Sequence, residues 1–182
     1  MNIYISILRG INVTGKKLIK MKDLRELYAS LNFQNITSYI QSGNIIFSHT
    51  KEEEAKLQQK ISKQIMTIYG FEVPVIVLSI QDLKQIIANN PFTKDMDKNP
   101  DFSHITFFST KPRNVDIERI EAKKRDSEDI VITEKAAYLY CPKGYGKTKL
   151  NNSFLENVLK TTATTRNWKT INKLLYIAEE IN

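Results

Sequence analysis

The chain is poor in the residues from which disulfides and metal sites are built. Its 182 residues include one cysteine, Cys141, and two histidines, His49 and His104. A single cysteine excludes an internal disulfide and is typical of proteins that work in a reducing cytoplasm. Because a structural zinc site needs four converging ligands, mostly Cys and His, we expect no metal and no other cofactor.

Long apolar runs are also missing. No stretch approaches the roughly 20 apolar residues that a membrane-spanning helix needs. The first residues lack the basic segment followed by an apolar one that marks a signal peptide. We therefore expect a cytoplasmic protein with no membrane partner.

Basic residues are present in excess and are unevenly distributed. The formal net charge is +7, and from Lys135 to Lys173 eight basic residues stand against one acid, Glu156. A second basic cluster lies within residues 16–25. Such clusters attract phosphate or another polyanion. Taken alone, however, lysine-rich stretches are more often ordinary solubilising surface.

Apolar periodicity divides the chain into two similar halves. The first half predicts strand, helix, strand, strand, helix and strand, which is the βαββαβ order of a ferredoxin-like unit. The second half predicts strand, helix, strand, strand and helix, and then a further helix where the last strand is due. The expected segments are 3–8, 21–31, 36–41, 44–48, 50–70 and 73–78 in the first half, and 105–109, 116–124, 130–133, 136–141, 150–159 and 168–178 in the second.

We therefore predict an α+β fold of two ferredoxin-like repeats, the second incomplete and ending in an extra helix. The first repeat is expected at residues 1–79 and the second, with the C-terminal helix, at 102–182. Residues 80–101 are expected to form a linking helix and loop, because Asn90-Pro91 ends a helical pattern and the polar stretch 95–101 follows.

Two loops rich in glycine and asparagine are expected to meet in the first repeat. Residues 9–17 follow the first strand, and residues 41–44 follow the second, which runs in the same direction. The loops should therefore be neighbours and present polar groups at one edge of the sheet, where binding groups tend to lie. The alternative is that these residues only satisfy turn geometry. For each residue alone this alternative is favoured, whereas their convergence favours function.

A third candidate is the threonine-rich stretch before the last helix. Its threonines are expected to cap that helix, so that Arg166 and Lys169 fall in the first turn, where the helix dipole disfavours cations. A basic first turn is explained if an anion binds there. Trp168 is expected on the buried face of the same helix.

The stretch from Cys141 to Thr148 ends in Gly146-Lys147-Thr148, as a phosphate-binding P-loop does. A P-loop has glycine where this chain has Cys141, so we exclude nucleotide hydrolysis by this motif. Lys147 and Lys149 remain candidate contacts for an anion. Neither histidine has a triad-like neighbour, and no catalytic residue is assigned.

Three motifs stand out along the chain. In chain order they are Leu8-Arg9-Gly10-Ile11-Asn12-Val13, Tyr39-Ile40-Gln41-Ser42-Gly43-Asn44 and Thr164-Thr165-Arg166-Asn167-Trp168. Together they resemble a bacterial family catalogued as domain of unknown function 1697. The resemblance covers nearly the whole chain, although Thr14 stands where the family often has a second glycine. It implies ferredoxin-like repeats but no activity and no catalytic residues, so function stays open.

We expect residues 9–17, 41–44 and 164–169 to form a basic edge that binds a phosphate-bearing small molecule or nucleic acid. One alternative is an enzyme that acts on a small phosphorylated substrate in the same cleft, with Asp23, Glu26 or Glu72 as base. Another is a homo-oligomeric or partner-binding module that uses its sheet edges. The candidate ligand-binding residues are Arg9, Gly10, Asn12, Gln41, Ser42, Asn44, Lys147, Arg166 and Asn167.

Overall fold

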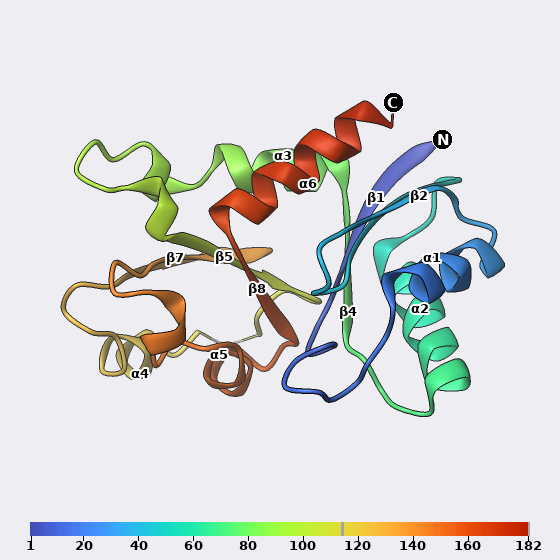
Figure 1. Cartoon of the computed structure of the whole chain (residues 1–182). Helices are drawn as coiled ribbons and strands as arrows, with labels where there is room; N and C mark the ends of the chain where they lie inside the picture. Colours follow the sequence, from blue (N-terminus) through green and yellow to red (C-terminus); the bar gives the residue numbers. More distant parts are fainter. Residues whose placement is uncertain (114, 182) are drawn as a thin grey trace. The chain divides into compact units, whose positions relative to one another are not determined.

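The chain folds into two compact units, each built around its own sheet. A computed structural model describes residues 1–113 and 115–181. The first unit comprises Met1–Lys84 and the segment that begins at Lys173, and the second comprises Gln85–Asn172 (Figure 1). These limits differ from the predicted ones. They fall inside two helices, and the apolar periodicity of a helix does not show where along it one unit ends and the other begins.

The first unit contains a four-stranded antiparallel sheet in the order β2-β3-β1-β4. The central strand β1 pairs with β3 on one side and β4 on the other, and β2 lies at the edge. The elements in chain order are β1 (Asn2–Leu8), α1 (Met21–Ser30), β2 (Gln34–Tyr39), β3 (Asn44–His49), α2 (Glu54–Tyr69) and β4 (Val75–Ser79), followed by α3 (Ile80–Ala88).

Helices α1 and α2 cover one face of this sheet (Figure 1). Both are amphipathic: α1 buries Leu24, Leu27 and Tyr28, and α2 buries three apolar residues at helical spacing. Ile68, which the same spacing predicts on the apolar face of α2, is exposed instead. These side chains pack on Tyr4, Leu8 and other strand residues in one apolar core. The helix α2 ends at Gly70, as expected, with a left-handed φ of 74°.

The edge strand β2 is irregular. Its register against β3 shifts between Gln34 and Thr37, and Asn35 within the shift has a left-handed φ of 50°. Such a bulge bends the strand and interrupts its ladder of hydrogen bonds. The connection from β2 to β3 spans residues 40–43, longer than the two-residue turn expected at Ser42-Gly43.

The second unit contains another four-stranded antiparallel sheet, in the order β6-β7-β5-β8. Helices α4 and α5 share one apolar core with its strands. The elements are the 3-10 turns η1 (Pro91–Thr93) and η2 (Pro100–Phe102), then β5 (Ser103–Phe108), α4 (Ile117–Glu121), β6 (Asp129–Ile132), β7 (Ala136–Tyr140), η3 (Tyr145–Lys147), α5 (Asn152–Leu159) and β8 (Ala163–Asn167), followed by α6 (Trp168–Glu180).

The prediction that the second half lacks its last strand is wrong. The segment Ala163–Asn167 is strand β8, which pairs antiparallel with β5. Its threonines hide the alternation of apolar residues that marks a strand, although β-branched residues favour strands. A cross-strand hydrogen bond of 2.7 Å joins the hydroxyls of Thr106 and Thr165. Both sheets therefore have the same strand order, with the first strand of each unit between the third and the fourth.

No helix among residues 1–113 and 115–181 is long and apolar enough to span a membrane.

Candidate functional site

Three connections meet at one end of the first sheet. The backbone N–H of Leu8 donates to the carbonyl of Gly43 at 2.8 Å, and the N–H of Arg9 donates to the carbonyl of Pro74 at 2.9 Å. The first bond joins the end of β1 to the β2–β3 hairpin, and the second joins it to the connection that precedes β4. The loop 9–17 and the hairpin are thus neighbours, as the strand directions predict.

The side chain of Asn12 holds the loop against the hairpin. Its amide nitrogen donates to the carbonyls of Ile19, at 2.9 Å, and Gln41, at 2.8 Å. Its amide oxygen accepts a hydrogen bond of 2.8 Å from the N–H of Ile19. Because these three bonds use both ends of the amide, the Asn12 side chain organises the loop through the backbone groups of Ile19 and Gln41.

Left-handed backbone conformations gather at this end of the unit. They occur at seven residues of the loop and the hairpin, three of which carry side chains that normally avoid this region, whereas three are glycine and one is asparagine. Strained backbone of this kind is often found at binding sites. The residues are Gly10, Asn12, Thr14, Gly15, Lys17, Ile40 and Gly43.

A pocket of about 430 Å³ opens beside the loop and the hairpin. Its lining is mixed: four apolar or aromatic side chains lie beside a lysine, a carboxylate and two amides. The lining residues are Asn12, Leu18, Ile19, Lys20, Met21, Asp23, Gln41 and Tyr69. The combination suits a small ligand that carries both an apolar group and an anionic group.

The charges around this pocket are of both signs. Lys16 and Lys20 are exposed, and Lys17 donates to the carbonyl of Glu72 at 2.6 Å. Within residues 1–113 and 115–181, no side chain caps the start of α1, where Lys20 is the N-cap residue. Partial burial raises the pKa of Tyr69, and the carboxylates of Asp23 and Glu26 raise it further.

Of the carboxylates considered as a general base, Asp23 lines the pocket. Glu26 lies 3.9 Å from Lys22. Neither contact assigns a catalytic role, so the enzyme alternative stays a prediction. Within residues 1–113 and 115–181, no group of three or more His, Cys, Asp or Glu side chains could hold a metal ion.

The remaining predicted residues of the first unit differ in accessibility. Gly10 and Gln41 are exposed, Arg9 and Ser42 are half-buried, and Asn44 is fully buried. The amide of Asn44 donates to the carbonyl of Tyr39 at 3.1 Å and to the hydroxyl of Ser42 at 2.9 Å. Asn44 therefore stabilises the hairpin from within, and Gln41 is the amide that faces the pocket.

The other three predicted residues, Lys147, Arg166 and Asn167, belong to the second unit. Lys147 is exposed in η3, while Arg166 and Asn167 end strand β8 instead of starting a helix. The carbonyl oxygen of the Asn167 side chain accepts from the N–H of Thr170 at 2.8 Å. The expected convergence of these residues with the loop 9–17 at one edge stays a prediction.

Arg166 donates hydrogen bonds to two neutral acceptors of its own strand. Its Nη1 donates to the Thr164 hydroxyl at 3.1 Å and to the Thr165 carbonyl at 2.9 Å. Burial lowers the pKa of Arg166 to about 10, which still leaves the guanidinium charged at neutral pH. The expected placement of Arg166 in the first turn of a helix is wrong, because Arg166 belongs to strand β8, and Trp168 is only half-buried. Anion binding at Arg166 stays a prediction.

A hydroxyl network that sequence patterns do not reveal joins η3 to β8. The Tyr145 hydroxyl donates to Thr165 at 3.0 Å, and the Thr165 hydroxyl donates to the Asn152 side chain at 2.6 Å. The ring of His104 stacks on Tyr145 at 5.1 Å. Burial lowers the pKa of His104, and a hydrogen bond with the Phe102 carbonyl partly opposes this shift. These side chains fix the turn that carries Lys147.

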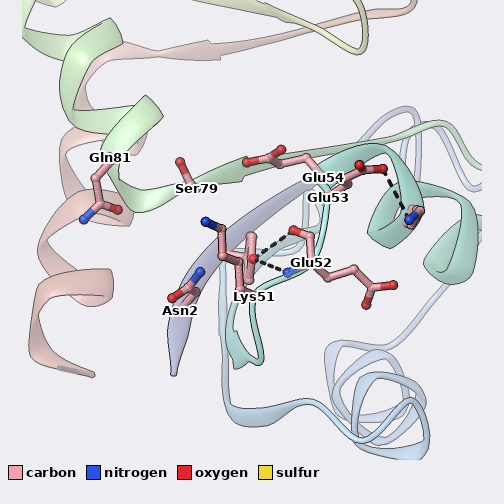
Figure 2. A pocket seen from close by; sticks show the side chains of 9 residues that line it. Asn2, Lys51, Glu52, Glu53, Glu54, Ser79 and Gln81 are labelled. Carbon is pink, nitrogen blue, oxygen red and sulfur yellow. Dashed lines mark hydrogen bonds and ion pairs between the residues drawn. The ribbon is translucent and has the colours of Figure 1, made fainter.

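A larger cavity, of about 660 Å³, lies at the opposite end of β1. Figure 2 shows an acidic run at the start of α2 on its wall, together with polar side chains of β1, β4 and the start of α3. Lys56 lies 3.5 Å from Glu53, so part of the acidic charge is compensated. The lining residues are Asn2, Tyr4, Lys51, Glu52, Glu53, Glu54, Lys56, Ser79 and Gln81.

Glu52 connects this cavity to the core. Its backbone N–H and carbonyl bond the hydroxyl of Tyr4 at 3.0 and 2.9 Å, and its carboxylate lies 2.8 Å from Lys60 and 3.2 Å from His49. The hydrogen bond from Lys60 is the main cause that holds the pKa of Glu52 below its ordinary value. Partial desolvation opposes this effect, and His49 adds to it.

Replacing Glu52 by glutamine should therefore reduce the free energy of unfolding at neutral pH but not in strong acid. A carboxyl whose pKa is lower in the folded state stabilises the fold above its unfolded pKa, and this contribution is lost as the pH falls through the folded pKa. Urea unfolding of both proteins from pH 7 to pH 2.5 measures the difference. Glu53→Gln is the control, because Glu53 is exposed and its pair with Lys56 should contribute little. A pH-independent difference for Glu52→Gln would contradict this account.

The fold places the chain among α+β proteins, with two four-stranded antiparallel sheets of equivalent strand order. Residues 1–138 match DUF1697, a family described as a protein of unknown function. Since the match covers more than half of the chain, the chain belongs to this family.

Among solved structures, the chain is similar to a conserved bacterial protein from Streptococcus pneumoniae. The two share 24% sequence identity, with 97% of this chain and 98% of that chain covered, and the TM-score is 0.73. At this identity the likeness concerns the fold alone. No curated protein matches the chain.

Proposed function

We propose that the protein binds a phosphate-bearing ligand, either a nucleotide or a nucleic acid, at the end of the first unit formed by loop 9–17 and hairpin 40–43. The observation that carries this proposal is the pocket of about 430 Å³ lined by the exposed Lys20, next to a loop that also carries the exposed Lys16. Lys20 and Gln41 line it, together with the apolar side chains of Leu18 and Met21. In the same proposal the protein acts in the cytoplasm.

The electrostatics of this end support an anionic ligand. From Arg9 to Lys22 the chain carries five basic residues and no acid. Lys20 stands at the start of the ten-residue helix α1, where the helix dipole adds positive potential. Asp23 lies on the pocket wall and limits the net charge there. The phosphate is therefore expected nearer to Lys16 and Lys20 than to the part of the pocket wall that carries Asp23.

Pre-organisation of the loop is the second support. The hydrogen bonds of Asn12 fix the loop to the hairpin before any ligand arrives. A loop that is already ordered loses little conformational freedom on binding, which favours affinity. Arg9, Lys147 and Arg166 belong to the proposed phosphate contacts only if the two units bring them to the same edge.

We further propose that both units are ferredoxin-like. The support is the order of elements, strand, helix, two strands, helix and strand, in each unit. The two equivalent strand orders agree with this proposal.

The double substitution Lys16→Ala and Lys20→Ala should weaken binding and reduce its salt dependence. Each lysine that contacts a phosphate contributes about 0.7 to 0.9 to the slope of log K against log salt, so the magnitude of the slope should fall by about 1.4 to 1.8. The measurement is fluorescence anisotropy of labelled single-stranded and double-stranded oligonucleotides, with unlabelled mononucleotides as competitors, between about 50 and 200 mM salt.

The matched control is the double substitution Lys51→Ala and Lys56→Ala. It removes the same charge from the opposite end of the unit, beside the larger cavity. If both double variants lose affinity and salt dependence equally, binding follows net charge alone and the proposed site is wrong. If the unsubstituted protein binds none of these ligands, the proposal is also wrong.

A further inference from the structure

Three aliphatic side chains are exposed on the connections that frame the smaller pocket. Val13, Leu18 and Ile40 have 56%, 66% and 49% of their surface exposed. Leu18 lines the pocket, Val13 follows Asn12, and Ile40 precedes Gln41. Because the Asn12 side chain bonds the Gln41 carbonyl, these positions lie close together. We call Val13, Leu18 and Ile40 the apolar rim.

The conformation of Ile40 works against the stability of the fold. Its φ is 51°, in the left-handed region, where a β-branched residue is a clear outlier. Half of its side chain faces water, so burial in the core does not offset the strain. Asparagine or glycine at this position would form the same hairpin with less strain. The isoleucine therefore has a use outside the fold itself.

The surroundings of the apolar rim are basic. Lys16 lies between Val13 and Leu18 in the chain, and its N–H donates to the carbonyl of Val13 at 3.0 Å. Lys20 is exposed and lines the same pocket as Leu18. An apolar surface with a basic border is complementary to a segment that combines aliphatic side chains with carboxylates.

We propose that the apolar rim docks an acidic amphipathic segment of a partner protein. Aliphatic side chains of that segment would cover Leu18 and Ile40, and its carboxylates would face Lys16 and Lys20. Three exposed side chains form a small surface, so the complex should be weak and transient. This inference goes beyond the proposed phosphate binding, because it gives a role to side chains that a phosphate does not contact.

Three labelled peptides of equal length test the proposal by fluorescence anisotropy. The first alternates leucine and glutamate at helical spacing, the second replaces its leucines by serine, and the third replaces its glutamates by lysine. We expect the protein to bind the first peptide only. The double substitution Leu18→Ser and Ile40→Asn should weaken this binding by about tenfold or more, because each aliphatic side chain loses its buried contact.

These substitutions should leave the fold intact. Leu18 is exposed, and asparagine tolerates the left-handed conformation of position 40 better than isoleucine does. The matched control is Met96→Ser, which removes an apolar side chain that is 98% exposed in the second unit. This control should bind the first peptide as tightly as the unsubstituted protein does. Urea unfolding checks that all variants remain folded.

Each of the other outcomes overturns the proposal. Equal binding of the leucine-free acidic peptide would mean that charge alone drives association. If the protein binds the basic peptide, or binds no peptide at all, its partner is not an acidic segment. If sedimentation shows that Leu18→Ser and Ile40→Asn dissociate a homodimer, the rim contacts a second copy of the chain. Nucleotide binding is measured separately on the single variant Ile40→Asn, because Ile40 does not line the pocket. Loss of nucleotide binding with Lys16→Ala and Lys20→Ala, but not with Ile40→Asn, keeps the two proposals distinct.

Discussion

Replacing Gly43 by alanine should destabilise the protein by about 2–4 kcal/mol, the largest effect that we expect from one added methyl group. A Cβ at this position would lie 2.7 Å from the Cβ of Leu8 and 2.7 Å from Cδ1 of Ile11. The Leu8 atom adjoins the backbone of β1 and cannot move cheaply. The φ of Gly43 is also +77°, which strains any side chain. The measurement is the urea dependence of unfolding, followed by circular dichroism.

Gly10→Ala and Gly15→Ala are the matched controls. Both glycines have a left-handed φ, 71° and 74°, but an added Cβ would have no described atom within 4 Å. In each control the free energy of unfolding should therefore fall only by the cost of a side chain at a left-handed φ, about 1–2 kcal/mol. The difference between Gly43→Ala and the controls isolates the close approach of the hairpin to β1. Equal losses at all three positions would show that this approach is not tight.

Replacing Asn12 by alanine should cost about 2–4 kcal/mol and also weaken ligand binding. The substitution removes three hydrogen bonds, each with a net contribution of about 1 kcal/mol, and places alanine at a φ of 55°. The loop then loses its attachment to the carbonyl of Gln41. Urea unfolding measures the first effect, and anisotropy with labelled oligonucleotides measures the second.

The stability of the variant Asn12→Asp should depend on pH. A carboxylate at this position accepts from the N–H of Ile19 but faces the carbonyl oxygens of Ile19 and Gln41. The fold should therefore raise the pKa of the new carboxyl. The contribution of the protonated carboxyl to the free energy of unfolding is then present below the unfolded pKa and lost as the pH rises through the folded pKa. Asn12→Asp should gain stability over Asn12→Ala only in acid.

The control for both variants is Asn35→Ala. Asn35 also has a left-handed φ, 50°, but its amide makes a single longer hydrogen bond of 3.3 Å to Ser48. Asn35→Ala should reduce the free energy of unfolding by less than Asn12→Ala does, and it should leave ligand binding unchanged. If Asn35→Ala weakens binding as much, the loop is not held by Asn12 in the way described.

Most of the first unit could be predicted because its apolar spacing is regular. Leu24, Leu27 and Tyr28 mark α1, and alternation marks β1. The contact between loop 9–17 and the hairpin followed from strand direction alone. The strand β8 was missed because its threonines carry no apolar alternation, and pairing with β5 makes it a strand. A short stretch of sequence does not show which distant segment it will pair with.

The candidate site was harder to predict than the fold. Asn12 and Asn44 look like ligand contacts in the sequence, yet their amides bond the backbone of the loop and the hairpin. Leu18 and Ile40 look like core residues, yet both are exposed. In each case the deciding quantity is the tertiary environment of one side chain. A pattern of residue types reports the average environment of such residues and cannot give the individual one.

The bulge in β2 has a consequence for self-association. A regular edge strand offers a straight row of donors and acceptors to which another chain can add. The register shift between Gln34 and Thr37 interrupts that row, and the left-handed Asn35 turns part of it aside. The first sheet therefore resists growth into a continuous intermolecular sheet through β2. A dimer that forms through β2 should therefore use side chains at this border instead of shared backbone hydrogen bonds.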